Sequence, residues 1–479
     1  MIPEQFQWQT GGRVLKTKLC VLALLLCAVF IGGTGLVVNV FPVLSLNTFA
    51  SKSSDYEPNL YDLYRYLSYP PFSSISLSIS LGDTRAFVSA DLRQELSAFL
   101  LGRDWSNLPI SADSLAPFVD PNFPRVGYLH YQNDSAVISA GRRKLGWGPG
   151  EHSFSLSTAA PYFDHIWLEL HNDTSFGEIF YGFFAVASDR TASGGPKTTI
   201  GHKYGLEVGG LRLCFAEQNL VYGTYPDLQD LGPFLIFHHT YQDLSNVIGF
   251  IMAEYSLGPV RVFGEFALDD FRLPTESKRS NPHGFGWSTG FDVQLIEGDI
   301  FETKGLFDED HALESRWNRF SGGLRFGYEF YHSSTYMYNR DVEIGKYTNP
   351  VRFNLFWTNW TTINTFYGFP YGADARLHTA MLSWESLKCK HLLRFEHIAI
   401  GAHGIDGDYG NPDVVDGDPF DQDWYGPVEP AERISRLSLD SSIALGKDLL
   451  LLLSPSVVVH AGEIDFDIRV GLAYQIVFR

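Results

Sequence analysis

The chain ends in the stretch EIDFDIRVGLAYQIVFR, residues 463–479, in which apolar and polar side chains alternate. Successive side chains of a β-strand point to opposite faces, so this pattern predicts one apolar face and one charged face. A strand of this kind is typical of a barrel wall that has lipid outside and a polar lumen inside. Only Val477, an apolar residue on the charged face, breaks the alternation. The predicted apolar face contains Ile464, Phe466, Ile468, Val470, Leu472, Tyr474, Ile476 and Phe478.

The same alternation recurs along the chain between short turn signals. Two alternating runs that flank a turn with Gly, Asn or Asp predict a β-hairpin. At about ten residues per crossing, residues 51–479 leave room for roughly 16 to 18 strands. We therefore predict an all-β fold, a transmembrane antiparallel β-barrel of about 16–18 strands with a short N-terminal helical or irregular plug segment. Alternating runs occupy residues 75–81, 85–92, 126–132, 136–141, 260–269 and 286–295.

The last strands predict which loops face outward. Both termini of such barrels usually lie in the periplasm. Residues 433–445 and 449–459 flank the turn Gly446-Lys447-Asp448, one hairpin before the C-terminal strand. Counting back from a periplasmic C-terminus therefore predicts that residues 403–432 are extracellular.

The first 50 residues have the layout of a secretory signal peptide. Basic residues precede an uncharged run over residues 19–38, and a small-residue cleavage site ends at Ala50. A retained membrane helix is one alternative, because about 20 apolar residues span a bilayer. Lipid attachment at Cys27 is another. We expect a signal peptide at residues 1–50, an N-terminal hairpin with a helical or plug segment at 51–125, and the transmembrane β-barrel at 126–479.

Residues 93–125 lose the alternation and contain four prolines. Within this segment Leu96, Phe99 and Leu100 lie at helical spacing. We expect a short helix followed by irregular chain, placed in the lumen or in the periplasm.

Composition restricts the partners. The formal net charge of −19 argues against nucleic acid. Of four cysteines, Cys20 and Cys27 lie in the predicted signal, while Cys214 and Cys389 are far apart; these two can pair, but no disulfide framework is implied. An aromatic content of 15% fits the girdles of a membrane barrel and also fits a soluble β-sandwich. We expect a monomeric barrel in the outer membrane, at the cell surface, with membrane lipid as a partner and no cofactor.

The predicted outer loop, residues 403–432, is strongly acidic and contains neither Lys nor Arg before Arg433. Carboxylates at this density suit Ca²⁺, although the sequence fails to match a 12-residue calcium loop. A solvated acidic loop is the alternative. Aromatic residues in the same loop suit stacking on sugar faces, and they also suit an ordinary surface loop. The calcium candidates are Asp406, Asp408, Asp416 and Asp418, and the sugar candidates are Tyr409, Trp424 and Tyr425.

The most distinctive motif is GRRKLGWGPG at residues 141–150, followed by SFSLSTAAP at residues 153–161. Glycines and a proline around Trp147 predict an unusual backbone. The motif resembles the Wzi family of capsule-assembly outer-membrane proteins. The likeness covers roughly residues 126–390 and includes HKYGL at 202–206, FLIFHHTY at 234–241, Tyr255, GEFALDDF at 264–271 and GFPYGADA at 368–375.

This resemblance implies an 18-stranded outer-membrane barrel that is closed inside by loops and a helical element. It also implies that the barrel holds exopolysaccharide at the cell surface. One acidic strand and one loop carry over to this chain. The matching residues are Gly264, Glu265, Asp269 and Asp270 in the strand, and Arg142, Arg143, Lys144 and Trp147 in the loop.

The three cations of this loop have two interpretations. Paired with lumenal acids such as Glu265 and Asp269, they would hold the loop across the barrel, because buried charge is expected to be paired. Alternatively they meet an acidic polysaccharide, since arginine forks suit the carboxylates of uronic acids. The two interpretations are compatible.

Catalytic motifs have little support. The sequence GWSTG at residues 286–290 matches G-x-S-x-G, but alternation runs through Ser288, whereas a nucleophile elbow needs a strand, a turn and a helix. Adjacent His238 and His239 would face opposite sides of a strand. The leading prediction is a non-enzymatic outer-membrane barrel that binds or organises surface polysaccharide. A porin or solute channel is the alternative, and a lipase using Ser288 is a third class.

Overall fold

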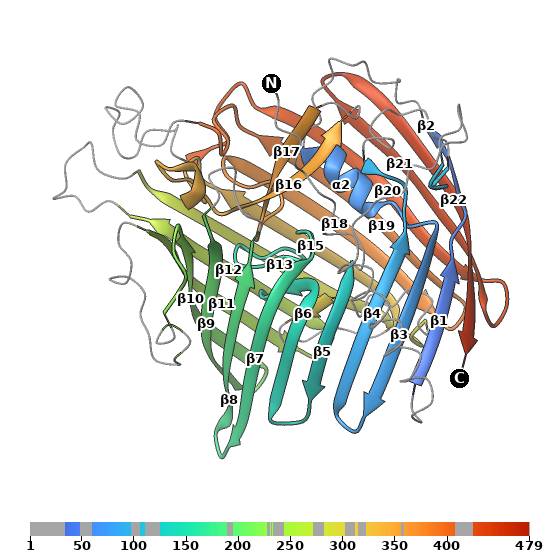
Figure 1. The fold of residues 1–479 in the computed structure, drawn as a ribbon, viewed down its shortest axis with the longest axis horizontal. Helices are drawn as coiled ribbons and strands as arrows, with labels where there is room; N and C mark the ends of the chain where they lie inside the picture. Colours follow the sequence, from blue (N-terminus) through green and yellow to red (C-terminus); the bar gives the residue numbers. More distant parts are fainter. Residues whose placement is uncertain are drawn as a thin grey trace, which may run out of the picture.

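The computed structural model shows one large antiparallel sheet that closes on itself (Figure 1). It describes residues 34–47, 60–96, 106–110, 125–188, 195–227, 230, 232, 244–271, 282–301, 312–314, 322–355, 359–407 and 425–478. The wall strands are β1 (Thr34–Val40), β2 (Val43–Asn47), β3 (Ser73–Leu81), β4 (Thr84–Leu92), β5 (Val126–Gln132), β6 (Ala136–Gly146), β7 (Phe163–Thr174), β8 (Gly177–Ala187), β9 (Lys197–Val208), β10 (Leu211–Tyr222), β11 (Ser245–Leu257), β12 (Val260–Asp270), β13 (Gly284–Glu297), β15 (Gly323–Ser333), β18 (Ala375–Ser386), β19 (Cys389–Ile400), β20 (Glu432–Ala444), β21 (Leu449–His460) and β22 (Glu463–Phe478).

Four smaller elements lie apart from this wall. They are the helix α2 (Leu60–Ser68), the short strand β14 (Ala312–Glu314), the hairpin of β16 (Thr348–Leu355) and β17 (Asn359–Phe366), and the 3-10 turn η4 (Glu343–Gly345). In the described part of the chain, no helix has the length and apolar character needed to cross a membrane.

The barrel closes between its first and last strands. The register of β1 against β22 runs from Leu36 opposite Phe478 to Val40 opposite Tyr474. The same register continues in β2, so β1 and β2 form one wall position interrupted at Phe41-Pro42. The other edge of β1 pairs with β3. The result is a closed antiparallel barrel with 18 strand positions, which confirms the predicted fold class.

The predicted N-terminal boundaries do not fit this closure. Strands β1 and β2 lie inside the predicted signal peptide, and cleavage after Ala50 would remove the strand that seals the barrel. Strands β3 and β4 also belong to the wall, so the barrel begins before residue 126. A leader would therefore have to end before Thr34. Residues 1–33, which hold the basic and most of the apolar part of the predicted signal, lie outside the described residues.

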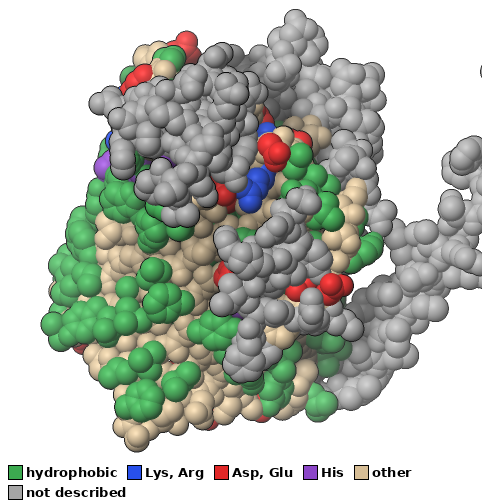
Figure 2. All heavy atoms as spheres, turned by 90° about the vertical axis from the view of Figure 1, so that its left-hand side faces the viewer, with side chains coloured by type: hydrophobic (Ala, Val, Ile, Leu, Met, Phe, Trp, Pro, Cys, Tyr) green, Lys and Arg blue, Asp and Glu red, His purple; other side chains and the backbone are tan. Residues whose placement is uncertain are grey.

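The two faces of β22 confirm the alternation predicted for it. Its eight apolar positions are between 38% and 57% exposed, whereas Asp467, Ala473 and Gln475 between them are buried. Hydrophobic side chains also dominate the lower part of the wall seen in Figure 2. Apolar surface of this extent on a closed barrel is the surface that lipid covers.

The two ends of the barrel differ. At the end where β22 finishes, all but one of the connections between strands have two to four residues (lower end, Figure 1). The other longer connections, α2 and the β16–β17 hairpin lie at the opposite end, called here the long-loop end. The described parts of the predicted extracellular segment, residues 403–407 and 425–432, belong to this end. Outer-membrane barrels carry short periplasmic turns and longer extracellular loops.

The predictions for the helix, the cysteines and the hairpins had different outcomes. The helix that the structure describes is α2, and no helix was predicted at its residues. Most of the helix predicted near Leu96 lies outside the described residues. Cys214 and Cys389 are free thiols, so they do not pair. The predicted hairpins are present with ends that differ by a few residues.

The closure generates a test by truncation. We expect a chain of residues 34–479 to refold in detergent into a compact barrel that migrates faster on unboiled than on boiled SDS gels. A chain of residues 51–479 should lose this mobility difference, because the facing edges of β22 and β3 would have unpaired backbone groups in lipid, at several kcal/mol each. Equal gel behaviour of the two chains would contradict the closure described here.

Candidate functional site

A loop between β6 and β7 crosses the interior of the barrel. We call residues 147–161 the plug loop. The end of β6 leads into it, because Lys144–Gly146 pair in parallel with β14 instead of continuing along the wall. The loop is buried along most of its length. It contacts β7 and β8 through Trp147, β10 through Ser155, and β19 through Glu151. Strand β19 lies far around the wall from β7, β8 and β10, so the loop bridges the lumen.

One anchor of the plug loop is Glu265 on β12. Its carboxyl oxygens accept the Ser153 hydroxyl at 2.9 Å and the Phe154 backbone N–H at 3.1 Å. Gly148 makes room for this contact, since a Cβ there would lie 2.6 Å from the Cβ of Ser153. Glu265 itself is buried. The acid that the sequence singled out therefore fixes the loop.

A second anchor lies on β15. Glu329 accepts the backbone N–H of Glu151 at 2.9 Å, and the Tyr331 hydroxyl accepts that of His152 at 3.0 Å. The Glu151 carboxylate pairs with Arg394 on β19 at 2.5 Å. Burial lowers the pKa of His152, so its ring is neutral at neutral pH. The loop thus satisfies charged side chains of two further wall strands.

Aromatic side chains fill the space around the loop. Phe163 stacks on Tyr367 with 5.3 Å between ring centroids, and Phe154 lies 5.3 Å from Phe369. Gly368 permits this packing, because a Cβ there would lie 2.3 Å from the carbonyl oxygen of Phe154. Packed rings at this burial exclude water from the centre of the barrel. The largest fully buried side chains include Trp147, Phe154, Phe163, Tyr331, Tyr338, Tyr347 and Tyr367.

A polar cavity of about 230 Å³ remains between α2, the plug loop and β19–β22. We call it the α2 cavity. Its lining holds more positive than negative charge, although the whole chain is acidic. Tyr64 and Tyr371 form an edge-to-face pair in the lining, 6.4 Å apart. The charged lining residues are Arg65, Lys144, Arg394, Arg436 and Arg469, with Glu396 and Asp467.

The three cations predicted to act together are separated. Arg142 is exposed and makes a bidentate pair with Asp164 on β7, both distances being 2.7 Å. Arg143 is buried with its guanidinium 4.0 Å from the centre of the Tyr128 ring. Lys144 lines the α2 cavity. The predicted anchoring of the loop by cations on Glu265 and Asp269 is therefore wrong in its chemistry: Ser153 and backbone amides make those contacts.

The remaining predicted residues have structural contacts as well. Trp147 is 1% exposed, with the Lys203 ammonium 4.8 Å from its ring, so a sugar cannot stack on it without displacing the plug loop. Asp269 accepts the Tyr338 backbone N–H at 2.7 Å. Asp270 pairs with Arg340 at 2.5 Å.

The described residues include only the two ends of the predicted acidic surface loop. Tyr425 is 44% exposed and lies 5.9 Å from Phe285, edge to face. Asp406 is exposed, and in the described ranges no three His, Cys, Asp or Glu side chains converge as metal ligands. Outside the described residues lie Tyr409, Asp408, Asp416, Asp418 and Trp424.

Sequence reasoning missed the wall residues of the α2 cavity. Arg394 and Glu396 on β19 are two residues apart, as are Asp467 and Arg469 on β22, and each pair faces inward. Inward charge two residues apart on a strand is a readable signal. The sequence gives no means to tell that these strands and Lys144 meet at one cavity.

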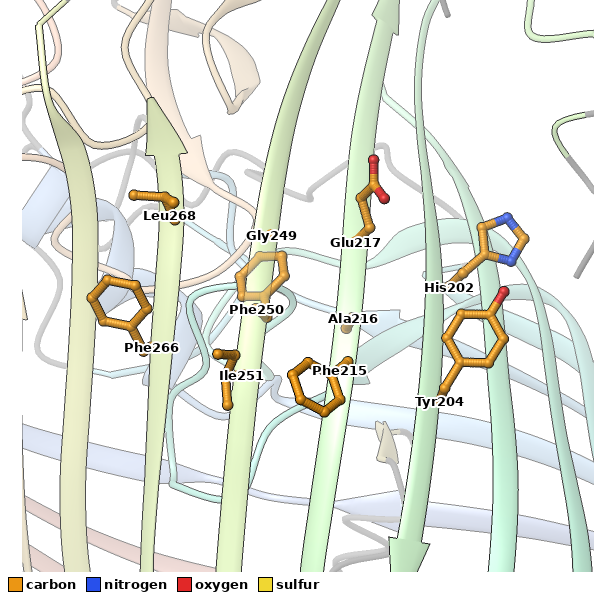
Figure 3. Close-up of a pocket in the computed structure, with 10 residues that line it drawn as sticks. All are labelled: His202, Tyr204, Phe215, Ala216, Glu217, Gly249, Phe250, Ile251, Phe266 and Leu268. Atoms are coloured by element: carbon orange, nitrogen blue, oxygen red, sulfur yellow. The ribbon is translucent and has the colours of Figure 1, made fainter. Parts of the chain in front are cut away.

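A larger hollow, about 530 Å³, lies on the outer wall across β9–β12 (Figure 3). Tyr204, Phe215, Ile251 and Phe266 occupy neighbouring strand positions there, and each is 39–63% exposed. Gly249, which has no side chain, leaves the gap among them. The hollow is apolar and belongs to the lipid-facing surface, so we do not assign it to ligand binding.

Comparisons with known proteins identify the kind of barrel. A solved structure of Wzi from Escherichia coli aligns with a TM-score of 0.51 at 11% identity, over 96% of this chain and 88% of Wzi. Wzi is described as an outer membrane protein involved in group 1 capsule assembly and as a carbohydrate-binding β-barrel. The protein is an outer-membrane β-barrel. Two further solved structures, OccAB4 of Acinetobacter baumannii and OccK3 of Pseudomonas aeruginosa, align with TM-scores of 0.43 and 0.42, both at 9% identity, over 93% of this chain and 98% and 96% of theirs. Neither a protein-family model nor a curated protein matches the sequence.

The Glu265 anchor predicts the effect of removing it. We expect Glu265→Ala to lower the free energy of unfolding by about 1–3 kcal/mol for each of the two buried donors left without an acceptor. Because the plug loop is then released at one anchor, current through planar bilayers should also rise. Glu297→Ala, at the exposed end of β13, is the matched control and should change neither quantity. Identical behaviour of the two variants would show that Glu265 does not hold the loop.

Proposed function

We propose that this outer-membrane barrel binds and organises surface polysaccharide and does not conduct solutes. The plug loop carries the proposal. A diffusion channel needs a continuous aqueous path, as in porins with open lumens. Here the loop is bonded to β12, β15 and β19, and fully buried aromatic rings surround it.

The overall likeness to Wzi supports the same proposal. Wzi is itself described as carbohydrate-binding, and the alignment spans nearly all of this chain. The predicted family motifs at residues 141–161, 264–271 and 368–375 all contribute to the plug and its anchors. The proposal for this chain is therefore a closed interior that supports loops at the cell surface.

Polysaccharide contacts are proposed at the long-loop end. Tyr425 is partly exposed there, and an amphipathic aromatic ring suits the apolar face of a sugar. Tyr409 and Trp424 belong to the same loop in sequence. We retain Ca²⁺ binding by Asp406, Asp408, Asp416 and Asp418 as a proposal on carboxylate chemistry alone.

We further propose that the protein is not an enzyme. Ser288 of the GWSTG motif lies in the middle of β13, opposite Glu265 on β12 and Tyr331 on β15. A nucleophile elbow needs a sharp turn from a strand into a helix, and β13 continues past this serine. We therefore expect Ser288→Ala to leave any ester hydrolysis by the preparation unchanged.

The proposed function is tested by native electrophoresis. We expect detergent-solubilised protein to retard an acidic exopolysaccharide in a concentration-dependent way, and to lose this effect after heat unfolding. Absence of retardation by folded protein across a panel of acidic and neutral polysaccharides would contradict the proposal.

Planar bilayers separate the porin alternative. A plugged barrel should give almost no current at moderate voltage, whereas a porin gives regular step conductances. Steps from the wild-type protein, together with no retardation of polysaccharide, would favour the solute channel.

A further inference from the structure

The α2 cavity has the features of a binding site for an acidic sugar. It lies in the barrel interior near the long-loop end, since Arg436 is four residues from the start of β20 and Asp467 is four residues from the start of β22. Its walls come from α2, the plug loop and four neighbouring barrel strands. We propose that this cavity binds one carboxylate-bearing sugar residue of an acidic polysaccharide, with Lys144 as the cation that receives the carboxylate. This inference rests on the proposed function and names the chemistry of its ligand.

The charge of the lining supports an anionic ligand. Five cationic side chains and two carboxylates face the cavity, in a chain whose net charge is −19. Positive charge in excess inside a partly desolvated space is unfavourable unless an anion balances it. The lining therefore attracts an anion that the rest of this acidic surface would repel.

Two of the cations, Arg394 and Arg436, are already paired with acids of the wall or loop. Arg394 lies 2.5 Å from Glu151 and 3.8 Å from Glu396. Arg436 lies 3.5 Å from the other oxygen of Glu396. These pairs fix the guanidinium groups in the cavity wall, where their remaining N–H donors suit the oxygens of a carboxylate.

A third paired cation, Arg469, also holds the wall. Its Nε lies 2.7 Å from Asp467, and its guanidinium is 4.9 Å from the centre of the Tyr69 ring. Asp467 in turn accepts the Ser45 hydroxyl at 2.8 Å. The β22 side of the cavity is thus held in place by contacts that include the closing strand β2.

Lys144 differs from these arginines. Among the described residues, no carboxylate lies within 4.0 Å of its ammonium group, and its closest aromatic contact is the Tyr162 ring, 5.8 Å away. Two further cations, Arg93 and Arg125, act on it by repulsion. An ammonium group among like charges and directed into a cavity is the natural partner for a ligand carboxylate.

Size and aromatic lining define the rest of the ligand. The cavity volume of about 230 Å³ is smaller than the roughly 300–1,000 Å³ of sites for drug-sized molecules, so it suits a single sugar residue. The edge-to-face pair of Tyr64 and Tyr371 supplies an apolar surface for a sugar ring. Tyr64 donates to the carbonyl oxygen of Pro370 at 2.8 Å, which fixes that ring. The Arg436 side chain is 34% exposed, so solvent reaches the cavity on its side.

The experiment compares three small probes by isothermal titration of the full-length protein in detergent. They are glucuronate, glucose as the neutral counterpart, and inorganic phosphate. We expect glucuronate to bind at least about tenfold more tightly than glucose, the effect of one hydrogen bond to a charged group. Phosphate should bind more weakly than glucuronate. Equal binding of glucose would overturn the role of charge, and equal or tighter binding of phosphate would overturn the sugar assignment.

Variants then test the named cation. Lys144→Met should weaken glucuronate binding about tenfold or more, while Lys144→Arg should keep it within about threefold, because the charge remains. Lys388→Met, in the short turn between β18 and β19, is the matched control and should bind as wild type does. Should Lys144→Met fail to fold, Arg436→Gln tests the β20 wall of the cavity and should also weaken glucuronate binding. Unchanged affinity in a folded Lys144→Met or Arg436→Gln variant would overturn the proposal.

The two proposals fail in different ways. If wild-type protein retards no polysaccharide, the proposed function is contradicted. If wild-type and Lys144→Met proteins retard an acidic polysaccharide equally and bind glucuronate equally, the surface-binding function stands and the α2 cavity is excluded as its sugar site.

Discussion

Every backbone N–H and C=O group of a strand in lipid must have a partner within the protein, and the fold follows from this constraint. A sheet meets it only when no edge is left open. In this chain the final edge is sealed by residues 34–47 against β22, in one register on both sides of Phe41-Pro42. The lipid-facing surface, the enclosed lumen and the placement of long loops at one end all depend on that seam.

Closure creates a second requirement inside the barrel. The inward-facing positions of the wall strands include charged side chains such as Glu265, Glu329 and Arg394. Such groups are costly to bury without partners. The plug loop supplies those partners through a serine hydroxyl, two backbone amides and one carboxylate. The plug loop thus provides the hydrogen-bond and ion-pair partners that inward-facing charged groups of the wall need. The same arrangement leaves the α2 cavity as the interior space with an excess of positive charge.

Strand alternation made most of the wall predictable, because a half-buried strand shows its two faces directly in sequence. The C-terminal hairpins and the hairpin around Asn133-Asp134 were predicted to within a few residues for that reason. The closing strand was missed because an apolar run has no alternation to separate a strand from the core of a signal peptide. Helix α2 was missed although its sequence carries the signal, since Leu60, Leu63 and Leu67 lie at helical spacing within its nine residues.

The site was predictable only in part. Glycines around Trp147 marked the plug loop, and Glu265, singled out as a lumenal acid, is one of the residues that contact it. The nature of the contact was not predictable, since sequence suggests charge pairs where the structure uses a serine and a backbone amide. The α2 cavity joins Lys144 to residues more than 200 positions later, and only barrel closure brings them together.

Hydrogen–deuterium exchange of the protein in lipid nanodiscs tests the central claim most directly. The amide hydrogens of Glu151, His152 and Phe154 are bonded to groups on β15 and β12. We predict protection of these three amides comparable to that of the wall strands. Exchange as fast as that of the exposed turn at residues 387–388 would contradict a barrel whose interior is closed by this loop.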